Sequence, residues 1–157
     1  MVRAHDVGQS AETILIGILL LEGGLALVGG VLLVAGPSGR LLRMPAEWLT
    51  GTPFSTYLIP GLLLASALGL LPLFAALALW RFRSMTGLRR VETTLGMDTA
   101  WLASLAAGTG IMIWIVAQIA MLRTLHPMHG FIFALGAAIV ALSLLPSVRR
   151  KHALPRR

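Results

Sequence analysis

The chain of 157 residues has no cysteine and few charged residues, which make up 12% of it. Without cysteine there is no disulfide scaffold, no thiolate metal site and no dithiol of the kind that several small four-helix membrane enzymes use with quinones. Because 57% of the residues are apolar, the scarcity of charge excludes an ordinary soluble domain. Intrinsic disorder is excluded as well, since disordered chains lack this apolar content. The sequence is therefore that of a protein whose solvent is lipid.

Long apolar runs are present instead, at residues 13–36, 57–80, 99–122 and 130–148. The first three contain 24 residues each, and a helix rising about 1.5 Å per residue then crosses a hydrocarbon core of about 30 Å. Unpaired backbone groups cannot face lipid, and the runs lack the period-two alternation of barrel strands. We expect one all-α domain over residues 1–157, an integral membrane four-helix bundle. The first run is too long for a cleavable signal peptide and should remain as a span.

The basic residues predict the orientation of this bundle. Ten of the 13 lysines and arginines lie in the N-terminal segment, in the loop between the second and third runs, and in the C-terminal tail. Arg40, Arg43 and Arg123 lie in the other two loops. By the positive-inside rule, both termini face the cytoplasm. The net charge of +7 is explained in this way without a nucleic-acid partner.

The first outer loop, residues 37–56, is expected to be an interfacial segment. Its apolar residues Leu41, Leu42, Trp48 and Phe54 are interspersed with charged ones. Such a mixture favours a position along the membrane interface. The alternative is a lid over a cavity that opens outward.

Small residues predict where the helices pack against each other. The second run carries Gly61, Ala65 and Gly69 at intervals of four, on one helix face. Helices in lipid associate by close backbone approach at such residues. We therefore expect this small-residue stripe to be a packing face.

Glu22 is the main candidate for an intramembrane polar site. It lies about 13 Å into the first run, near the membrane midplane. A carboxylate at that depth is costly and faces protein or water rather than lipid. Ser66 and Thr109 fall at a similar depth in their own runs, so we expect them to be its hydrogen-bond partners. Glu22 is either a proton or cation site or a structural acid that fixes helix register.

Further candidates lie toward the outer side. Gln118, near the outer end of the third run, is either part of a polar site or an amide that joins two helices. His126 and His129 lie close to methionines, and imidazole and thioether groups are ligands for copper or another soft metal. Pro127 lies between the two histidines and works against a helical metal-binding pair. No histidine falls within a run, which argues against haem, and no other cofactor is indicated.

Signatures of catalysis are missing from the sequence. There is no nucleophile elbow, phosphate loop, carboxylate pair or zinc-helix motif. The sequence therefore leans away from an enzyme without deciding the question.

Several short motifs resemble those of a known family. They are Leu21 to Gly24, Pro37 to Gly39, Thr52 to Ser55, Tyr57 to Gly61, Leu79 to Arg81, Ile113 to Ile115, and the pair His126 and Pro127. Together they resemble a family of small four-span bacterial membrane proteins with no established activity. The layout is also distantly similar to that of DoxX-type four-helix proteins. The resemblance implies a four-span architecture and a location in the bacterial cytoplasmic membrane.

Three functional hypotheses follow from these features. The first is a non-enzymatic accessory or assembly subunit that acts through helix–helix contacts, in a larger membrane complex or a homo-oligomer. The second is a small proton-coupled transporter or exporter that uses Glu22. The third is a metal-binding factor at His126 and His129.

Overall fold

The computed structural model describes residues 2–82, 86–123 and 125–154 of the chain. Within these residues, the helices long and apolar enough to cross a membrane are Gly8–Ala35, Leu58–Arg81, Thr99–Met121 and Pro127–Leu144. The prediction of an all-α protein with four spans is thereby confirmed. The chain is a multi-pass membrane protein, with a lipid bilayer as its surroundings.

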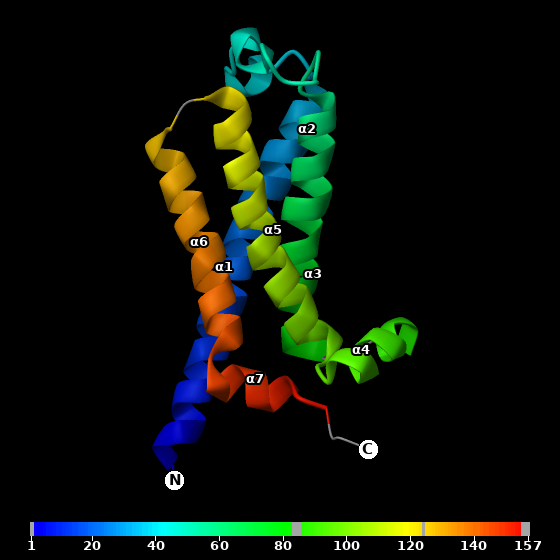
Figure 1. Ribbon diagram of the computed structural model, residues 1–157, viewed down its shortest axis with the longest axis vertical. Coiled ribbons are helices and arrows are strands. Elements are labelled where there is room, and N and C mark those ends of the chain that lie inside the picture. Colours follow the sequence, from blue (N-terminus) through cyan, green and yellow to red (C-terminus); the bar gives the residue numbers. More distant parts are fainter. Residues whose placement is uncertain (1, 83–85, 124, 155–157) are drawn as a thin grey trace.

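Figure 1 shows the four spans packed side by side. They are α1 (Val2–Ala35), the pair α2 (Leu58–Leu63) and α3 (Leu71–Leu77), α5 (Thr99–Leu122) and α6 (Pro127–Leu144). The short helices α4 (Arg89–Leu95) and α7 (Pro146–His152) lie at the end of the bundle that holds both termini. We call this the terminal end, and we call the opposite end, with residues 36–57, 123, 125 and 126, the loop end.

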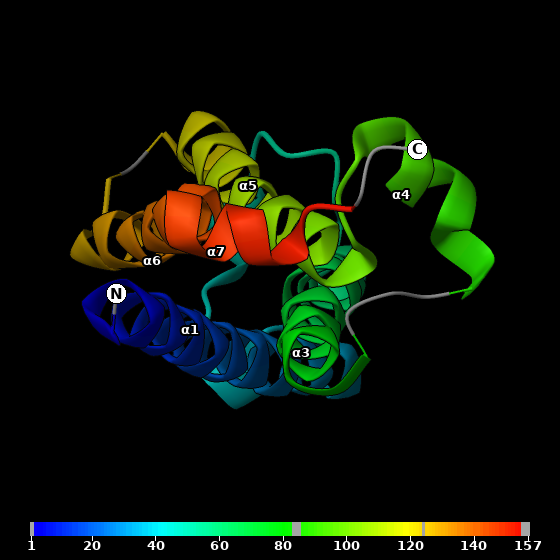
Figure 2. The same cartoon turned by 90° about the horizontal axis from the view of Figure 1, so that it is seen from below.

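The spans form two layers around a common core. Seen from the terminal end, α1 and α3 lie in one layer and α5 and α6 in the other, with α7 across the latter (Figure 2). Leu15 and Leu19 of α1 belong to one buried apolar cluster with Ile111 and Ile139 of the other layer, and each of the four is at most 1% exposed. This cluster is the core of the bundle.

Glycines bring two pairs of spans into backbone contact. A methyl group at Gly30 would lie 2.7 Å from the Cβ of Ala65 and from the carbonyl oxygen of Gly61. A methyl group at Gly108 would lie 2.9 Å from the carbonyl oxygen of Gly136. Because real side chains do not approach so closely, α1 and the second span, and likewise α5 and α6, require glycine at these crossings.

The second span is not a uniform α-helix. π-helical turns at Leu64–Leu70 precede Pro72, and a second set covers Ala78–Phe82. Proline lacks an N–H group and its ring clashes with the carbonyl four residues earlier, so the wider π-helical turns accommodate it. The widened segment lies beside the cavity described below.

The fourth span differs from the predicted run of residues 130–148. It begins at Pro127 and ends at Leu144, and α7 follows at a new angle. Leu145, with φ −53° and ψ 133°, is extended because the following Pro146 disfavours helical conformation in the residue before it. Residues 146–148 therefore belong to a separate helix rather than to the span.

Candidate functional site

A cavity of about 350 Å³ lies beside Glu22, near the middle of the span Gly8–Ala35. Its other lining residues come from all four spans: Leu25, Ala26, Leu64, Leu68, Ile111, Trp114, Ile115, Gln118, Met128, Phe131 and Ile132. Apart from Glu22 and Gln118, this lining is apolar or aromatic. Pockets of this kind, apolar with a few polar groups, are typical of small-molecule sites.

The Glu22 carboxylate has no partner within the described part of the chain. The residue is 6% exposed, yet no hydrogen bond or ion pair joins it to any of these residues. A structural acid that fixes helix register would be expected to have a hydrogen-bond partner, because an unpaired polar group in apolar surroundings is costly. The carboxylate is instead left facing a cavity.

Gln118 also lines a second cavity, which lies at the loop end. The second cavity, of about 150 Å³, is bordered by Leu64, Trp114 and Gln118, which also border the first. Its remaining lining comes mainly from the loop over residues 37–57: Leu42, Met44, Trp48, Leu49, Thr52, Phe54 and Tyr57, together with Leu33, Pro60 and Met121. The two cavities therefore lie next to each other and share these three residues, Leu64, Trp114 and Gln118, as walls. We call the pair, which extends from Glu22 to the residues of the loop, the crevice.

The expected partners of Glu22 lie elsewhere, so that part of the prediction is wrong. Ser66 is exposed and its hydroxyl donates to the carbonyl of Leu62 at 2.7 Å. Thr109 is also exposed and does not line the cavity. Depth alone does not fix which way a side chain points: Thr109 follows Gly108, which faces α6, and one residue turns a helix by about 100°.

The small-residue stripe lies against α1. A methyl group added at Gly61 would lie 2.7 Å from the Cβ of Leu33, and one at Gly69 would lie 2.9 Å from the backbone of Leu27. Ala65 meets Gly30 at the same face. The stripe is therefore covered within the chain.

Tyr57 fixes the loop that covers the second cavity. Its hydroxyl donates to the carbonyl of Pro45 at 2.6 Å, and its backbone N–H donates to the carbonyl of Pro37 at 2.9 Å. Burial, with the Glu47 carboxylate as a lesser cause, raises the pKa of the Tyr57 phenol above its usual value. Gly39, at φ +78°, packs against the tyrosine ring where no side chain fits. Residues of the loop thus line the second cavity, and Trp48 is 49% exposed.

His126 and His129 form a capping box at the start of α6. The Nδ1 atom of His126 accepts from the backbone N–H of Met128, and Nδ1 of His129 accepts from the backbone N–H of His126. These bonds satisfy backbone donors of the first turn. Among the described residues, no group of three or more histidine, aspartate or glutamate side chains is arranged to hold a metal ion.

A polar cluster at the terminal end was missed by the sequence reasoning. His152 of α7 is 1% exposed and lies between two carboxylates: its Nδ1 is 2.7 Å from Oδ2 of Asp98 and its Nε2 is 3.1 Å from Oε1 of Glu12. The other oxygen of Glu12 accepts a hydrogen bond from Lys151. We call Glu12, Asp98, Lys151 and His152 the terminal cluster. It joins α1, the start of α5 and α7.

Further hydrogen bonds hold the residues around the terminal cluster. Asp98 caps α5 by accepting from the N–H of Trp101 at 3.0 Å, and its own N–H donates to the carbonyl of His152. Glu92 of α4 accepts from the backbone N–H of Thr99 at 2.8 Å and from its hydroxyl. An aspartate directly before an apolar run is the usual sign of a helix N-cap, so this one role was readable from the sequence.

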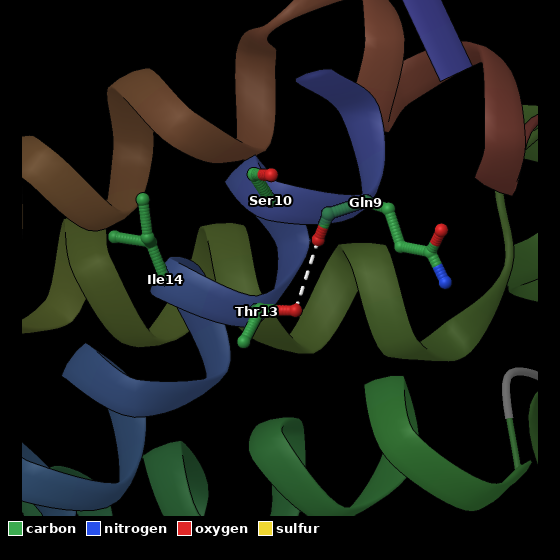
Figure 3. A pocket seen from close by; sticks show the side chains of 4 residues that line it. All are labelled: Gln9, Ser10, Thr13 and Ile14. Atoms are coloured by element: carbon green, nitrogen blue, oxygen red, sulfur yellow. Dashed lines mark hydrogen bonds between the residues drawn. The ribbon is translucent and has the colours of Figure 1, made fainter. Parts of the chain in front are cut away.

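A shallow groove on α1 near the terminal end is lined by Gln9, Ser10, Thr13 and Ile14 (Figure 3). The hydroxyl of Thr13 donates to the carbonyl of Gln9 at 2.9 Å, so it is engaged within its own helix. Ile14 is 55% exposed. This groove is a surface feature of one helix, whereas the cavity at Glu22 is lined by residues of all four spans.

Comparisons with protein-family models, with curated proteins and with solved structures find no match for this chain. The functional assignment therefore rests on the site itself.

Proposed function

We propose that this protein is a small proton-coupled carrier that binds lipophilic organic cations at Glu22. The observation that carries this proposal is a partnerless carboxylate at the middle of a span, lining a cavity that is otherwise apolar and aromatic. In such surroundings an isolated carboxylate is neutralised by a proton or by a bound cation. Exchange of one for the other couples cation movement to proton movement.

The lining residues suit an apolar cation better than a hydrated metal ion. Trp114 and Phe131 offer aromatic faces, which attract organic cations through their quadrupoles. Gln118 adds one amide, whereas a hard metal ion needs several oxygen ligands. The site therefore favours a cation that buries apolar surface as well as charge.

The orientation and location of the carrier are also part of the proposal. The bias of basic residues supports a cytoplasmic terminal end and an outward loop end. In this orientation the second cavity lies on the outer side of the membrane. The buried apolar core around Leu15 and Leu19 then lies between Glu22 and the cytoplasm. The resemblance of the short motifs supports the bacterial cytoplasmic membrane and membership of the four-span family. Assembly into a homo-oligomer is also part of this proposal.

The other two hypotheses gain no comparable support. An accessory subunit would use the small-residue stripe for a partner helix, but Gly61, Ala65 and Gly69 are covered by α1. A metal-binding factor would use His126 and His129, which instead accept hydrogen bonds from the backbone at the start of α6. The carrier is the function that the described geometry supports best.

Equilibrium binding of tetraphenylphosphonium to the detergent-purified protein tests the proposal. We expect saturable binding by the wild-type protein and at least a tenfold loss of affinity in Glu22→Gln, which keeps size and polarity but removes the charge. Glu47→Gln is the matched control, because Glu47 is an exposed acid that lines neither cavity. No saturable binding by the wild-type protein, or equal affinity in Glu22→Gln, would overturn the proposal.

A further inference from the structure

The crevice defines the shape of the ligand as well as its charge. We infer that the cation carried by this protein is an amphiphile with an alkyl chain, whose charged group lies at Glu22 and whose chain passes Gln118 into the cavity beneath the loop. This inference rests on the proposed function and adds the class of substrate. It is carried by the three residues that border both cavities, Leu64, Trp114 and Gln118.

The second cavity has the lining that an alkyl chain requires. Met44, Trp48, Leu49 and Phe54 of the loop face apolar side chains of the spans across it, and no charged residue lines it. Methionine is flexible and aromatic rings are broad, so such a lining adapts to chains of different length. A compact cation fills the cavity at Glu22 and leaves the second one empty, whereas an amphiphile fills both.

Burial of the alkyl chain of the ligand predicts how the affinity depends on the length of that alkyl chain. Each methylene group removed from water increases affinity by about fourfold at full burial. Octyltrimethylammonium has four more methylenes than butyltrimethylammonium and should displace tetraphenylphosphonium far more effectively. In a protein whose second cavity is filled, that preference for the longer chain should shrink.

Substitutions that fill only the second cavity provide the test. Met44→Trp and Leu49→Trp should leave tetraphenylphosphonium affinity within about twofold while reducing the preference for octyl over butyl at least tenfold. Leu125→Trp is the control, because Leu125 is 79% exposed and lines neither cavity. All proteins are measured in the same detergent, so partition of the longer chain into micelles cancels.

The outcomes separate this inference from the proposed function. If the wild-type protein binds tetraphenylphosphonium but shows no preference for the octyl compound, or if both tryptophan variants keep that preference, the amphiphile inference is overturned and the carrier proposal stands. If no cation binds, both are overturned.

The terminal cluster carries a second inference that does not depend on the carrier. Both ring nitrogens of His152 face carboxylate oxygens, at 2.7 Å and 3.1 Å. A neutral imidazole donates from one nitrogen only, whereas an imidazolium donates from both. We infer that protonation of His152 latches α7 to the bundle, and that loss of this proton releases α7.

The charges around His152 support a latch. α1 contributes Glu12, the start of α5 contributes Asp98, and α7 itself contributes Lys151, which is bound to Glu12. The described part of α6 presents its one titratable side chain, His129, at the loop end, and Glu92 of α4 is engaged by Thr99. With His152 protonated the cluster is neutral, and without that proton a carboxylate faces a nitrogen lone pair.

A spin label on α7 tests the latch, and the absence of cysteine makes single-site labelling simple. We place a nitroxide at Arg150→Cys, an exposed position, and compare it with Arg89→Cys on α4. The label on α7 should be immobile at low pH and become mobile as the pH is raised, because only the imidazolium donates from both ring nitrogens. The label on α4 should not change.

His152→Gln gives the second arm, because glutamine keeps hydrogen-bonding groups but does not titrate. In that background the label on α7 should be equally mobile at every pH. A label that stays immobile throughout in the wild-type background, or a transition that persists in His152→Gln, would overturn the latch.

Discussion

The Nδ1 atom of His152 lies 2.7 Å from Oδ2 of Asp98, which is 54 residues away in the sequence. This contact joins the last helix of the chain to the residue that caps α5. A single carboxylate therefore performs two tasks, since one oxygen caps a helix and the other holds a histidine.

Replacement of Asp98 should be strongly destabilising. Asp98→Ala removes the helix cap, worth about 1 kcal/mol, and leaves His152 without one of its partners, so a total loss of about 3 kcal/mol or more is expected. Asp98→Asn keeps the capping oxygen and should lose less. The measurement is denaturant unfolding in mild detergent, and equal stability of the alanine variant and the wild-type protein would contradict the role of this residue.

The crossing of α5 and α6 makes a sharp prediction about two neighbouring glycines. Gly108→Ala places a methyl group 2.9 Å from the carbonyl of Gly136 and should cost about 1 to 3 kcal/mol of stability. Gly110→Ala meets no atom within 4 Å and should be neutral or slightly stabilising, because alanine favours the helix. If both variants unfold alike, the close approach of the two helices is contradicted.

Tyr57 is the one tyrosine of the chain, so its titration is readable directly from the near-ultraviolet absorbance of tyrosinate. Burial raises the pKa of its phenol, so its midpoint should lie above the ordinary value of about 10. Glu47→Gln removes the lesser cause and should lower the midpoint.

The sign of the linked effect on the loop follows from the raised pKa of Tyr57. A phenol that is harder to ionise in the folded loop than in the unfolded one stabilises the fold fully below about pH 10. That stabilisation is lost as the pH rises through the higher, folded value. A midpoint at or below the ordinary value, or a loop that stays protected from hydrogen exchange above it, would contradict this account.

Two buried acids should respond in opposite ways to replacement by leucine. Glu92 accepts two hydrogen bonds from Thr99, so Glu92→Leu leaves buried donors unpaired and should be destabilising by about 1 to 3 kcal/mol. Glu22 has no such partner among the described residues, so Glu22→Leu should leave stability unchanged or raise it. If Glu22→Leu is as destabilising as Glu92→Leu, Glu22 is a structural acid instead of a binding group.

The sequence allowed the spans to be predicted because lipid imposes one strong rule, that apolar runs of sufficient length form helices. The burial of Glu22 followed from the same rule, since a carboxylate at that depth avoids lipid. The residues around the Glu22 carboxylate could not be predicted from this rule. Ser66 and Thr109 lie at the same depth as Glu22 but do not bond to it. Which face of a helix is turned toward its neighbours depends on packing contacts such as those of Gly30 and Gly108, and these cannot be read from depth.

The terminal cluster could not be predicted from local sequence patterns. His152 lies 140 residues from Glu12, and the two meet only because Pro146 turns the chain across the end of the bundle. A histidine within a basic tail shows no sequence pattern that indicates burial, so the position of His152 could be known only once the turn at Pro146 was known. In the same way, the crevice depends on where residues 37–57 fold back, which Tyr57 and Gly39 decide through contacts distant in sequence.

Proton release on cation binding tests the central claim most directly. Tetraphenylphosphonium is added to the purified protein in weakly buffered solution over a series of starting pH values, and the protons released per bound cation are counted. We predict that release approaches one proton per cation at low pH, declines as the pH rises, and is absent from Glu22→Gln. Binding without proton release at every pH, or equal release from Glu22→Gln, would contradict the exchange of proton and cation at Glu22.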